Sequence, residues 1–214
     1  MIHINNLSLT IKKDAILNDI NLHIKKGRIT GLVGRNGCGK TMLMKCITGF
    51  VKPTEGEVIF DNKKIGVDVD FPDNVGIIIE TPSFVPYYSG MKNLIELASL
   101  KRIIGKKEIE AVLKQVGLYE ARKKQVRKYS LGMRQRLGIA QALMEKPDTL
   151  ILDEPMNGLD NDCVNLIRGI LNDLRNQGKT ILLVSHNEED IRMLCDDIYE
   201  MDKGQIINTK KKAN

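Results

Sequence analysis

The segment from Gly34 to Thr41 restricts this chain to a small group of folds. It reads GRNGCGKT, a complete G-x-x-x-x-G-K-[ST] pattern, with the apolar run Ile29–Val33 before it and a helical pattern over 40–49 after it. A glycine-rich loop between a strand and a helix points backbone N–H groups at phosphate oxygens, and the helix N-terminus adds the positive end of its dipole. The segment therefore predicts a loop that binds a nucleoside triphosphate.

Two side chains of this loop have distinct expected roles. Lys40 is expected to reach the β- and γ-phosphates, and the hydroxyl of Thr41 is expected to hold Mg²⁺. The remaining positions contribute mainly backbone N–H groups. The predicted phosphate-binding residues are thus consecutive: Gly34, Arg35, Asn36, Gly37, Cys38, Gly39, Lys40 and Thr41.

The pattern along the chain predicts an α/β fold. Short apolar or alternating runs suit strands, and most of 81–147 has helical spacing. Strands that alternate with helices favour a mostly parallel sheet covered on both faces. We therefore predict one domain over 1–214, a P-loop NTPase (RecA-like) core at 1–80 and 148–214 with an N-terminal antiparallel β region and an inserted helical subdomain at 81–147. The expected strands are 2–11, 20–24, 29–33, 57–60, 75–79, 150–153 and 180–184, with a closing hairpin at 203–204.

Composition narrows the possible partners and the compartment. The net charge is +6, but Lys and Arg are spread out apart from the tail Lys210–Lys212, and aromatic residues make up only 4% with no Trp. Bases would find few stacking platforms, so no nucleic-acid partner is expected. The four cysteines show no CxxC pairing, which disfavours both disulfides and zinc.

The chain offers no obvious way to enter a membrane by itself. Its longest apolar runs, Ile77–Ile79 and Ile181–Val184, are far shorter than the roughly 18–20 residues of a membrane span. The N-terminus does not combine a charged start with an apolar core, so no signal peptide is expected. We expect a cytoplasmic protein whose membrane role depends on a partner.

A second candidate site consists of acidic residues that follow a predicted buried strand. Leu150 to Leu152 are apolar, and Asp153 and Glu154 come directly after them. The carboxyl end of a strand is where α/β sheets bind ligands. Asp153 is placed to contact Mg²⁺ through water, and Glu154 is placed to polarise an attacking water.

Three further motifs complete a recognisable series. YSLGMRQR lies at 129–136, GLD at 158–160, and Ser185-His186 follows the strand at 180–184. With these motifs, the chain resembles the ABC ATPase family over essentially its whole length. In order, the stretches are similar to that family's Walker A loop, signature, Walker B strand, D-loop and switch histidine. The segments YSLGMRQRLGIA and IIIETP are similar to the corresponding segments of ATPases that serve bacitracin- and lantibiotic-type exporters.

The resemblance implies a mechanism that uses two subunits. ATP held by the loop of one subunit is capped by the signature of the other, where Ser130 and the backbone N–H of Gly132 bond the γ-phosphate. Glu154 is the implied general base, His186 contacts the γ-phosphate, and Asp160 joins the nucleotide-contacting residues. The implied partners are a second ATPase subunit, identical or a close paralogue, and integral membrane permease subunits that hold the pair at the inner face of the membrane.

The chain departs from the family pattern at three places. The usual signature LSGGQ reads YSLGM here, keeping Ser130 and Gly132. The place of an adenine-stacking aromatic falls on Ile11, which offers only apolar contact. The usual Gln after the strand at 75–79 is Glu80, which we expect to be a metal ligand that crowds the neighbouring carboxylates.

Two other functions compete with transport. The first is a soluble ATPase acting on nucleic acid or ribosomes, but such family members carry long coiled-coil insertions or two ATPase domains. The second is a degenerate ATP-binding regulator, which would lack Glu154 or His186. The sequence favours transport, with export favoured by the narrower resemblance. We also expect the segment 81–93 to dock the membrane partner through Phe84, Tyr87, Tyr88 and Met91.

Overall fold

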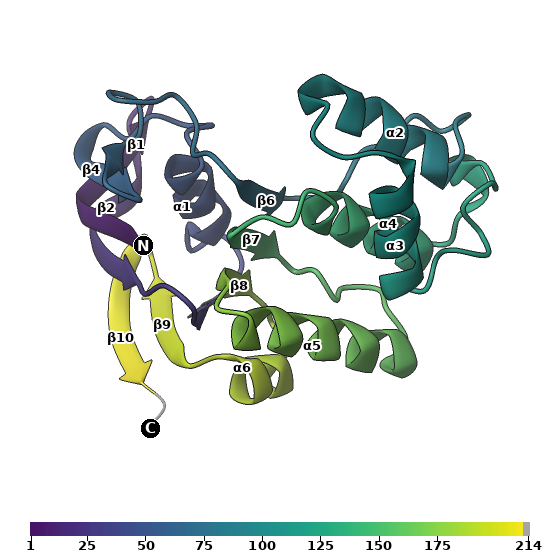
Figure 1. The fold of residues 1–214 in the computed structure, drawn as a ribbon. Helices are drawn as coiled ribbons and strands as arrows, with labels where there is room; N and C mark the ends of the chain where they lie inside the picture. Colours follow the sequence, from purple (N-terminus) through teal and green to yellow (C-terminus); the bar gives the residue numbers. More distant parts are fainter. Residues whose placement is uncertain (212–214) are drawn as a thin grey trace.

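A computed structural model describes residues 1–211 of the chain (Figure 1), so Lys212 of the basic tail lies outside the described residues. The described part contains a four-stranded sheet and a six-stranded sheet. The smaller sheet is antiparallel and has the order β2-β1-β4-β5. Its strands confirm the predicted N-terminal β region: β1 (Ile2–Ile11), β2 (Asp14–Ile24), β4 (Glu55–Phe60) and β5 (Lys63–Lys64).

The six-stranded sheet has the order β10-β9-β3-β8-β7-β6 and is parallel except for the edge strand β10. The chain returns to this sheet from distant parts of the sequence, and the carboxyl ends of β3, β6, β7 and β8 share one edge. That edge is the expected ligand-binding edge of such a sheet. The strands are β3 (Ile29–Val33), β6 (Val75–Ile78), β7 (Thr149–Asp153), β8 (Thr180–Val184), β9 (Asp197–Asp202) and β10 (Gln205–Lys211).

Both faces of this sheet are buried, which explains why its strands read as continuous apolar runs. Because side chains alternate along a strand, Leu150 and Leu152 pack into one core cluster and Ile151 packs into another. The helix α1 (Lys40–Ile47) belongs to the second cluster, together with β1 and β2. On the other face lie α5 (Asn161–Asn176) and α6 (Glu188–Leu194) (Figure 1).

The helix α6 was not predicted from the sequence. It has seven residues, and only Ile191 and Leu194 give it a buried apolar side. It begins at the N-cap Asn187, whose side chain accepts a hydrogen bond from the Glu189 amide at 2.8 Å. Two apolar residues are too few for a periodic signal, so the cap and tertiary packing determine this helix.

The inserted segment forms a helical lobe beside the sheet (Figure 1). Its helices are α2 (Gly90–Lys101), α3 (Lys106–Gln115) and α4 (Leu131–Leu143). The end of α4 packs closely on β6, because a Cβ on Gly76 would lie 2.1 Å from the Ala142 carbonyl oxygen. Since α4 contacts both the lobe and the sheet, the predicted division at 81 and 147 remains a prediction. Among the residues that the structure describes, no helix is long and apolar enough to cross a membrane.

Candidate active site

A cavity of about 430 Å³ opens at the carboxyl edge of the six-stranded sheet. The predicted phosphate-binding loop, the residues that follow β6, the end of β7 and the second residue after β8 all contribute to it. The structure therefore brings together motifs that lie up to 150 residues apart (His186 against Asn36). Its lining includes Asn36, Gly37, Gly39, Lys40, Thr41, Glu80, Gln135, Asp153, Glu154 and His186.

The loop from Gly34 to Thr41 has the curled backbone that its glycines predict. Gly34 has a φ of 150°, and a Cβ there would lie 2.1 Å from the Met201 carbonyl oxygen. Gly39 has a φ of 106° and directly precedes α1. Lys40 is only 7% exposed, and its ammonium donates hydrogen bonds to the carbonyl oxygens of Gly34 at 2.6 Å and Arg35 at 2.9 Å. A buried cation is thus fixed at the mouth of an N–H-lined loop, which suits a phosphate.

Thr41 and Asp153 are adjacent although 112 residues separate them. The Thr41 hydroxyl donates a hydrogen bond to Asp153 Oδ2 at 2.9 Å. The two oxygen donors are thus adjacent and fit a Mg²⁺ that Thr41 would bind directly and Asp153 would contact through water, as predicted. The described residues hold no group of three or more His, Cys, Asp or Glu side chains that could bind a metal without help. Waters and substrate phosphates commonly complete a Mg²⁺ shell.

Glu154 has the features of a general base. Burial raises the pKa of its carboxyl, and nearby His186 and Lys40 oppose that rise. Its Oε1 is buried and accepts no hydrogen bond within the described residues, and it lies 3.3 Å from His186 Nε2. A carboxylate with a raised pKa and an oxygen without a hydrogen-bond donor, in a residue that lines the cavity, suits proton abstraction from a water. Glu154 also has a φ of 49°, a strained value for a residue with a side chain.

Gln135 supports this carboxylate residue from the signature helix, a role that the sequence did not reveal. Its side chain is 8% exposed, and its Nε2 donates hydrogen bonds to the carbonyl oxygens of Glu154 at 3.0 Å and Pro155 at 3.1 Å. Both bonds cross from α4 to the turn after β7. A polar residue on the buried side of a helix was the only sequence signal that could have indicated this contact.

Glu80 lines the cavity but is bound to a lysine. Lys45 Nζ, one turn along α1 from Thr41, lies 2.5 Å from Glu80 Oε1, and the Glu80 side chain is 64% exposed. This pairing balances the charge that we expected to crowd the other carboxylates. Burial is the main cause that raises the pKa of Glu154, and the charge of Asp153 adds to it. Crowding of the carboxylates by Glu80 stays a prediction. Metal ligation by Glu80 stays a prediction.

The structure does not bring three predicted residues into this cavity. Ser130 is the N-cap of α4 and accepts a hydrogen bond from the Met133 amide at 3.2 Å. Gly132 follows it and faces Gly158, whose carbonyl oxygen would lie 3.1 Å from an added Cβ. Asp160 caps α5, and the hydrogen bonds from Cys163 lower the pKa of its carboxyl. None of the three lines the loop cavity, although Leu131, between Ser130 and Gly132, does. Their contact with a nucleotide stays a prediction.

The residue expected to contact adenine also lies outside the cavity lining. Ile11 ends β1 and is 42% exposed, and it does not line the cavity. Ile16, on β2, does line it. The counting from the second strand placed the apolar position five residues too early for this cavity, and contact between Ile11 and adenine stays a prediction.

Comparison with known proteins agrees with this geometry. The ABC transporter family matches residues 17–157. The ABC transporter ATP-binding protein YybJ of Bacillus subtilis is 42% identical, over 99% of this chain and 97% of its own length. The bacitracin transport ATP-binding protein BcrA of Enterococcus faecalis is 42% identical over 97% of this chain and 68% of its own length. The lantibiotic transport ATP-binding protein SrtF of Streptococcus pyogenes is 37% identical over 99% and 91%.

Solved structures of ABC transporter cassettes have the same fold. The dimeric ABC transporter cassette MJ0796 superimposes with a TM-score of 0.91 at 27% identity, with all of both chains covered. Its dimeric post-hydrolysis form bound to ADP and Pi has a TM-score of 0.90 at 26% identity, again over both whole chains. The predicted P-loop NTPase fold is confirmed. The phosphate-binding loop, the adjacent Thr41 and Asp153, and Glu154 thus lie in the cavity of a protein with this family's fold. The chain belongs to the ABC transporter family and is an ATP-hydrolysing, ATP-binding subunit of a transporter.

Proposed function

We propose that this chain works in a pair of ATPase subunits beneath a membrane permease and drives the export of a peptide antibiotic or a similar compound. The observation that carries the proposal is that Ser130 and Gly132 do not line the cavity of the loop that they are expected to complete, although Leu131 between them does. The names of BcrA and SrtF, which are transport ATP-binding proteins for bacitracin and a lantibiotic, support the cargo class. Attachment to a permease would place the chain at the cytoplasmic face of the membrane.

The pairing follows from the geometry of the two half-sites. Ser130 caps the N-terminus of α4, and a helix N-terminus can bind an anion. Neither Ser130 nor Gly132 lines the loop cavity of its own chain, although Leu131 between them does. A second copy, or a close paralogue, facing the first would bring this helix end over the phosphates bound at Lys40. Each ATP would then touch both subunits and hold them together, and hydrolysis would weaken that contact.

Lys40, Thr41 and Asp153 would bind the triphosphate end of ATP. The Lys40 ammonium, now bonded to two loop carbonyls, is close enough to the loop to exchange them for phosphate oxygens. Thr41 and Asp153 would hold Mg²⁺, which neutralises phosphate charge and orients the γ-phosphate.

Glu154 and His186 would carry out the chemical step. Glu154 accepts a proton from the water that attacks the γ-phosphate, and the bond from phosphorus to the bridging oxygen breaks, which gives ADP and phosphate. His186, 3.3 Å from Glu154, donates a hydrogen bond toward the γ-phosphate and steadies the water. The paired helix end of Ser130 would bond the developing charge from the other side.

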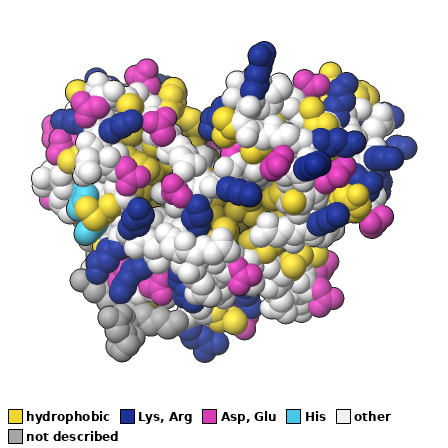
Figure 2. Space-filling view, in the orientation of Figure 1, with side chains coloured by type: hydrophobic (Ala, Val, Ile, Leu, Met, Phe, Trp, Pro, Cys, Tyr) yellow, Lys and Arg dark blue, Asp and Glu magenta, His cyan; other side chains and the backbone are white. Residues whose placement is uncertain are grey.

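An apolar groove near the active site suits the permease. A hollow of about 500 Å³ lies between α1 and the helical lobe, with β6 at its floor and Phe50, Leu97 and Leu100 on its sides. Figure 2 shows hydrophobic side chains gathered in a hollow between these two parts of the molecule. Phe50 is 55% and Leu100 is 79% exposed. Exposed apolar surface of this kind marks protein interfaces.

The groove is a better docking surface than the four residues that the sequence suggested. Met91 is buried and Phe84 is partly buried against the core cluster, so both offer a partner less surface than the groove does. Tyr87 and Tyr88 remain near the surface, with Arg127 and Lys92 against their rings. The groove includes Thr81 to Ser83 from the predicted segment, and β6 leads from it to Glu80. A partner seated there could thus influence the cavity.

Co-purification from the native host tests this proposal. The tagged chain should bring down an integral membrane protein with multiple spans, and Phe50→Glu combined with Leu100→Glu should reduce recovery at least about tenfold by placing charges in an apolar contact. Quantitative mass spectrometry of the purified complex gives the measurement. Ile207→Glu, at a 58% exposed apolar residue on β10, is the matched control. Equal recovery with the groove variant and the control would contradict docking in the groove.

The role of Glu80 is tested by titrating Mg²⁺ against ATP turnover. Glu80→Gln should shift the curve to higher Mg²⁺ concentration while keeping measurable activity, because an amide is a weaker metal ligand without the negative charge. Glu80→Ala should lose most activity. Lys45→Met should shift the curve to lower Mg²⁺, because it releases the carboxylate from its ion pair. Superimposable curves for the wild type and both Glu80 variants would mean that Glu80 never approaches the metal.

A further inference from the structure

The residues on both sides of His186 are fixed by hydrogen bonds, although His186 itself is exposed. Ser185 is 6% exposed, and its Oγ accepts a hydrogen bond from the Asn187 amide at 3.1 Å. The same hydroxyl donates to Asp190 Oδ2 at 3.0 Å. The short loop that carries the histidine is therefore tied to the first turn of α6 by one buried hydroxyl.

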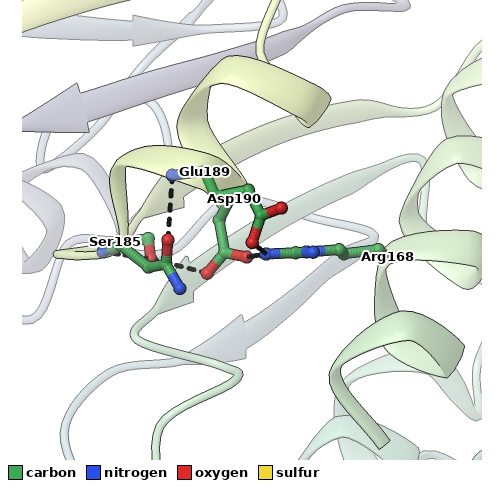
Figure 3. Close-up of polar contacts among 5 residues, drawn as sticks. Arg168, Ser185, Glu189 and Asp190 are labelled. Atoms are coloured by element: carbon green, nitrogen blue, oxygen red, sulfur yellow. Dashed lines mark hydrogen bonds and ion pairs between the residues drawn. The ribbon is translucent and has the colours of Figure 1, made fainter. Parts of the chain in front are cut away.

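Asp190 connects this loop to another helix. Its side chain is 3% exposed, and its Oδ1 accepts hydrogen bonds from Arg168 on α5, from Nε at 2.8 Å and from Nη2 at 2.5 Å. Arg168 is 9% exposed and also contacts Glu189 at 3.0 Å. Figure 3 shows Arg168 reaching from its helix to Asp190, with Ser185 on the far side of that carboxylate.

A buried ion pair of this kind calls for an explanation other than stability. Removing two charges from water costs about as much as their attraction returns, so an apolar pair of similar volume often serves as well. Another ion pair of α5, Arg175 with Asp196 at 3.4 Å, is more exposed and does not contact the histidine loop. What distinguishes Arg168 and Asp190 is that their hydrogen bonds continue through Ser185 to the residue after His186.

We propose that Arg168, Asp190 and Ser185 form a positioning network that holds His186 beside Glu154 and links it to α5. The inference rests on the proposed contact between His186 and the γ-phosphate. The imidazole lies 3.3 Å from Glu154 Oε1, and a displacement of about 1 Å at a reacting group can lower a rate by about a hundredfold. The network fixes the backbone on both sides of that imidazole, so its loss should mainly affect the chemical step.

The network also gives the partner subunit a route to the histidine. Helix α5 begins directly after its N-cap Asp160, and Arg168 lies two turns farther along the same helix. Between this helix and the histidine loop is a hollow of about 560 Å³ that Glu154, Gly158, Arg168 and His186 line. A contact that shifts the start of α5 would move Arg168 and, through Asp190, the loop that carries His186.

The test combines kinetics with histidine NMR on the full chain. The chain has three histidines, and His3 and His23 stack on each other in the N-terminal sheet with ring centroids 4.1 Å apart, so they serve as internal references. Ser185→Ala and Asp190→Asn should shift the imidazole signals of His186 alone. They should lower kcat about tenfold or more and leave the KM for ATP within about twofold. Ser185→Thr, which keeps the hydroxyl, should restore most of kcat.

Arg175→Met is the matched control, since it breaks an ion pair of the same helix away from the histidine, and it should change neither the His186 signals nor kcat. Unchanged signals and kcat in both network variants would overturn the proposal, as would an equal effect of the control. Thermal unfolding of each variant checks that it is folded, and the small change in Ser185→Ala keeps the test valid if Asp190→Asn unfolds. Signals that move while kcat stays, with His186→Gln also fully active, would uphold the network and contradict the proposed role of His186.

Discussion

Replacing Glu154 with glutamine is expected to lower kcat by about a hundredfold to ten-thousandfold while ATP still binds. Glutamine keeps the shape of the side chain but cannot accept the proton of the attacking water, and general bases contribute rate factors of about this size. Lys40, Thr41 and Asp153 are unchanged, so the affinity for ATP should stay within about threefold of the wild type. Steady-state ATPase assays and nucleotide titration measure the two quantities separately.

Glu120→Gln is the matched control for this change. Glu120 is exposed and lies in the helical lobe, so its variant should retain wild-type turnover. If Glu154→Gln also hydrolysed ATP at the wild-type rate, Glu154 would be excluded as the base, and the raised pKa and unsatisfied oxygen would need another explanation.

Replacing Lys40 with methionine is expected to weaken ATP binding by about a hundredfold or more. The variant keeps the buried apolar stem but loses the ammonium, and charge-assisted bonds to phosphate are among the strong contributions to binding. It also leaves the carbonyl oxygens of Gly34 and Arg35 without their donor. Isothermal titration calorimetry with ATP and Mg²⁺ gives the affinity, and thermal unfolding without nucleotide separates lost binding from lost folding.

Lys45→Met provides the comparison within the same helix. Lys45 lies on α1, five residues after Lys40, and is ion-paired with Glu80. Its loss should change the affinity for ATP by less than about threefold. Equal losses of affinity in the two variants would argue that general charge at the cavity, not the loop position of Lys40, binds the phosphates.

The central parts of the fold and site could be predicted because they depend on local sequence. The apolar strand runs, the glycines at 34, 37 and 39 and the two carboxylates after Leu152 each specify their structure within a few residues. The order of these segments along the chain then fixed the carboxyl edge of the sheet as the meeting point. The hydrogen bond between Thr41 and Asp153 confirms that the two motifs share one place.

The supporting contacts could not be predicted because they join residues that are distant in sequence, even where both residues lie in motifs. Gln135 reaches the carbonyl oxygen of Glu154, 19 residues away, and Lys45 reaches Glu80, 35 residues away. Arg168 and Asp190 belong to two helices whose packing decides their contact. Such contacts depend on which helix faces match, and that information appears only in the packed structure.

Two expectations depended on which residues face the cavity or the core. Ile11 was assigned by counting back along the chain from Asp19–Leu22. The structure places Ile16 in the cavity lining, and contact of Ile11 with adenine stays a prediction. Met91 was read as surface because it lies among aromatic residues, whereas it opens α2 on the buried side of the helix. Local sequence predicts that a helix or strand forms, but it does not show which face of that helix or strand tertiary packing buries.

The claim at the centre of this account is that ATP holds two of these subunits together, and a mass measurement of the Glu154→Gln variant tests it most directly. Size-exclusion chromatography with light scattering should give the monomer mass of 24.1 kDa with ADP and twice that mass with ATP and Mg²⁺. Adding Ser130→Arg, which places a bulky cation at the helix end proposed to cap the opposing ATP, should return the ATP sample to the monomer mass. A monomer mass for Glu154→Gln in saturating ATP and Mg²⁺, with binding of ATP verified in the same sample, would contradict the claim.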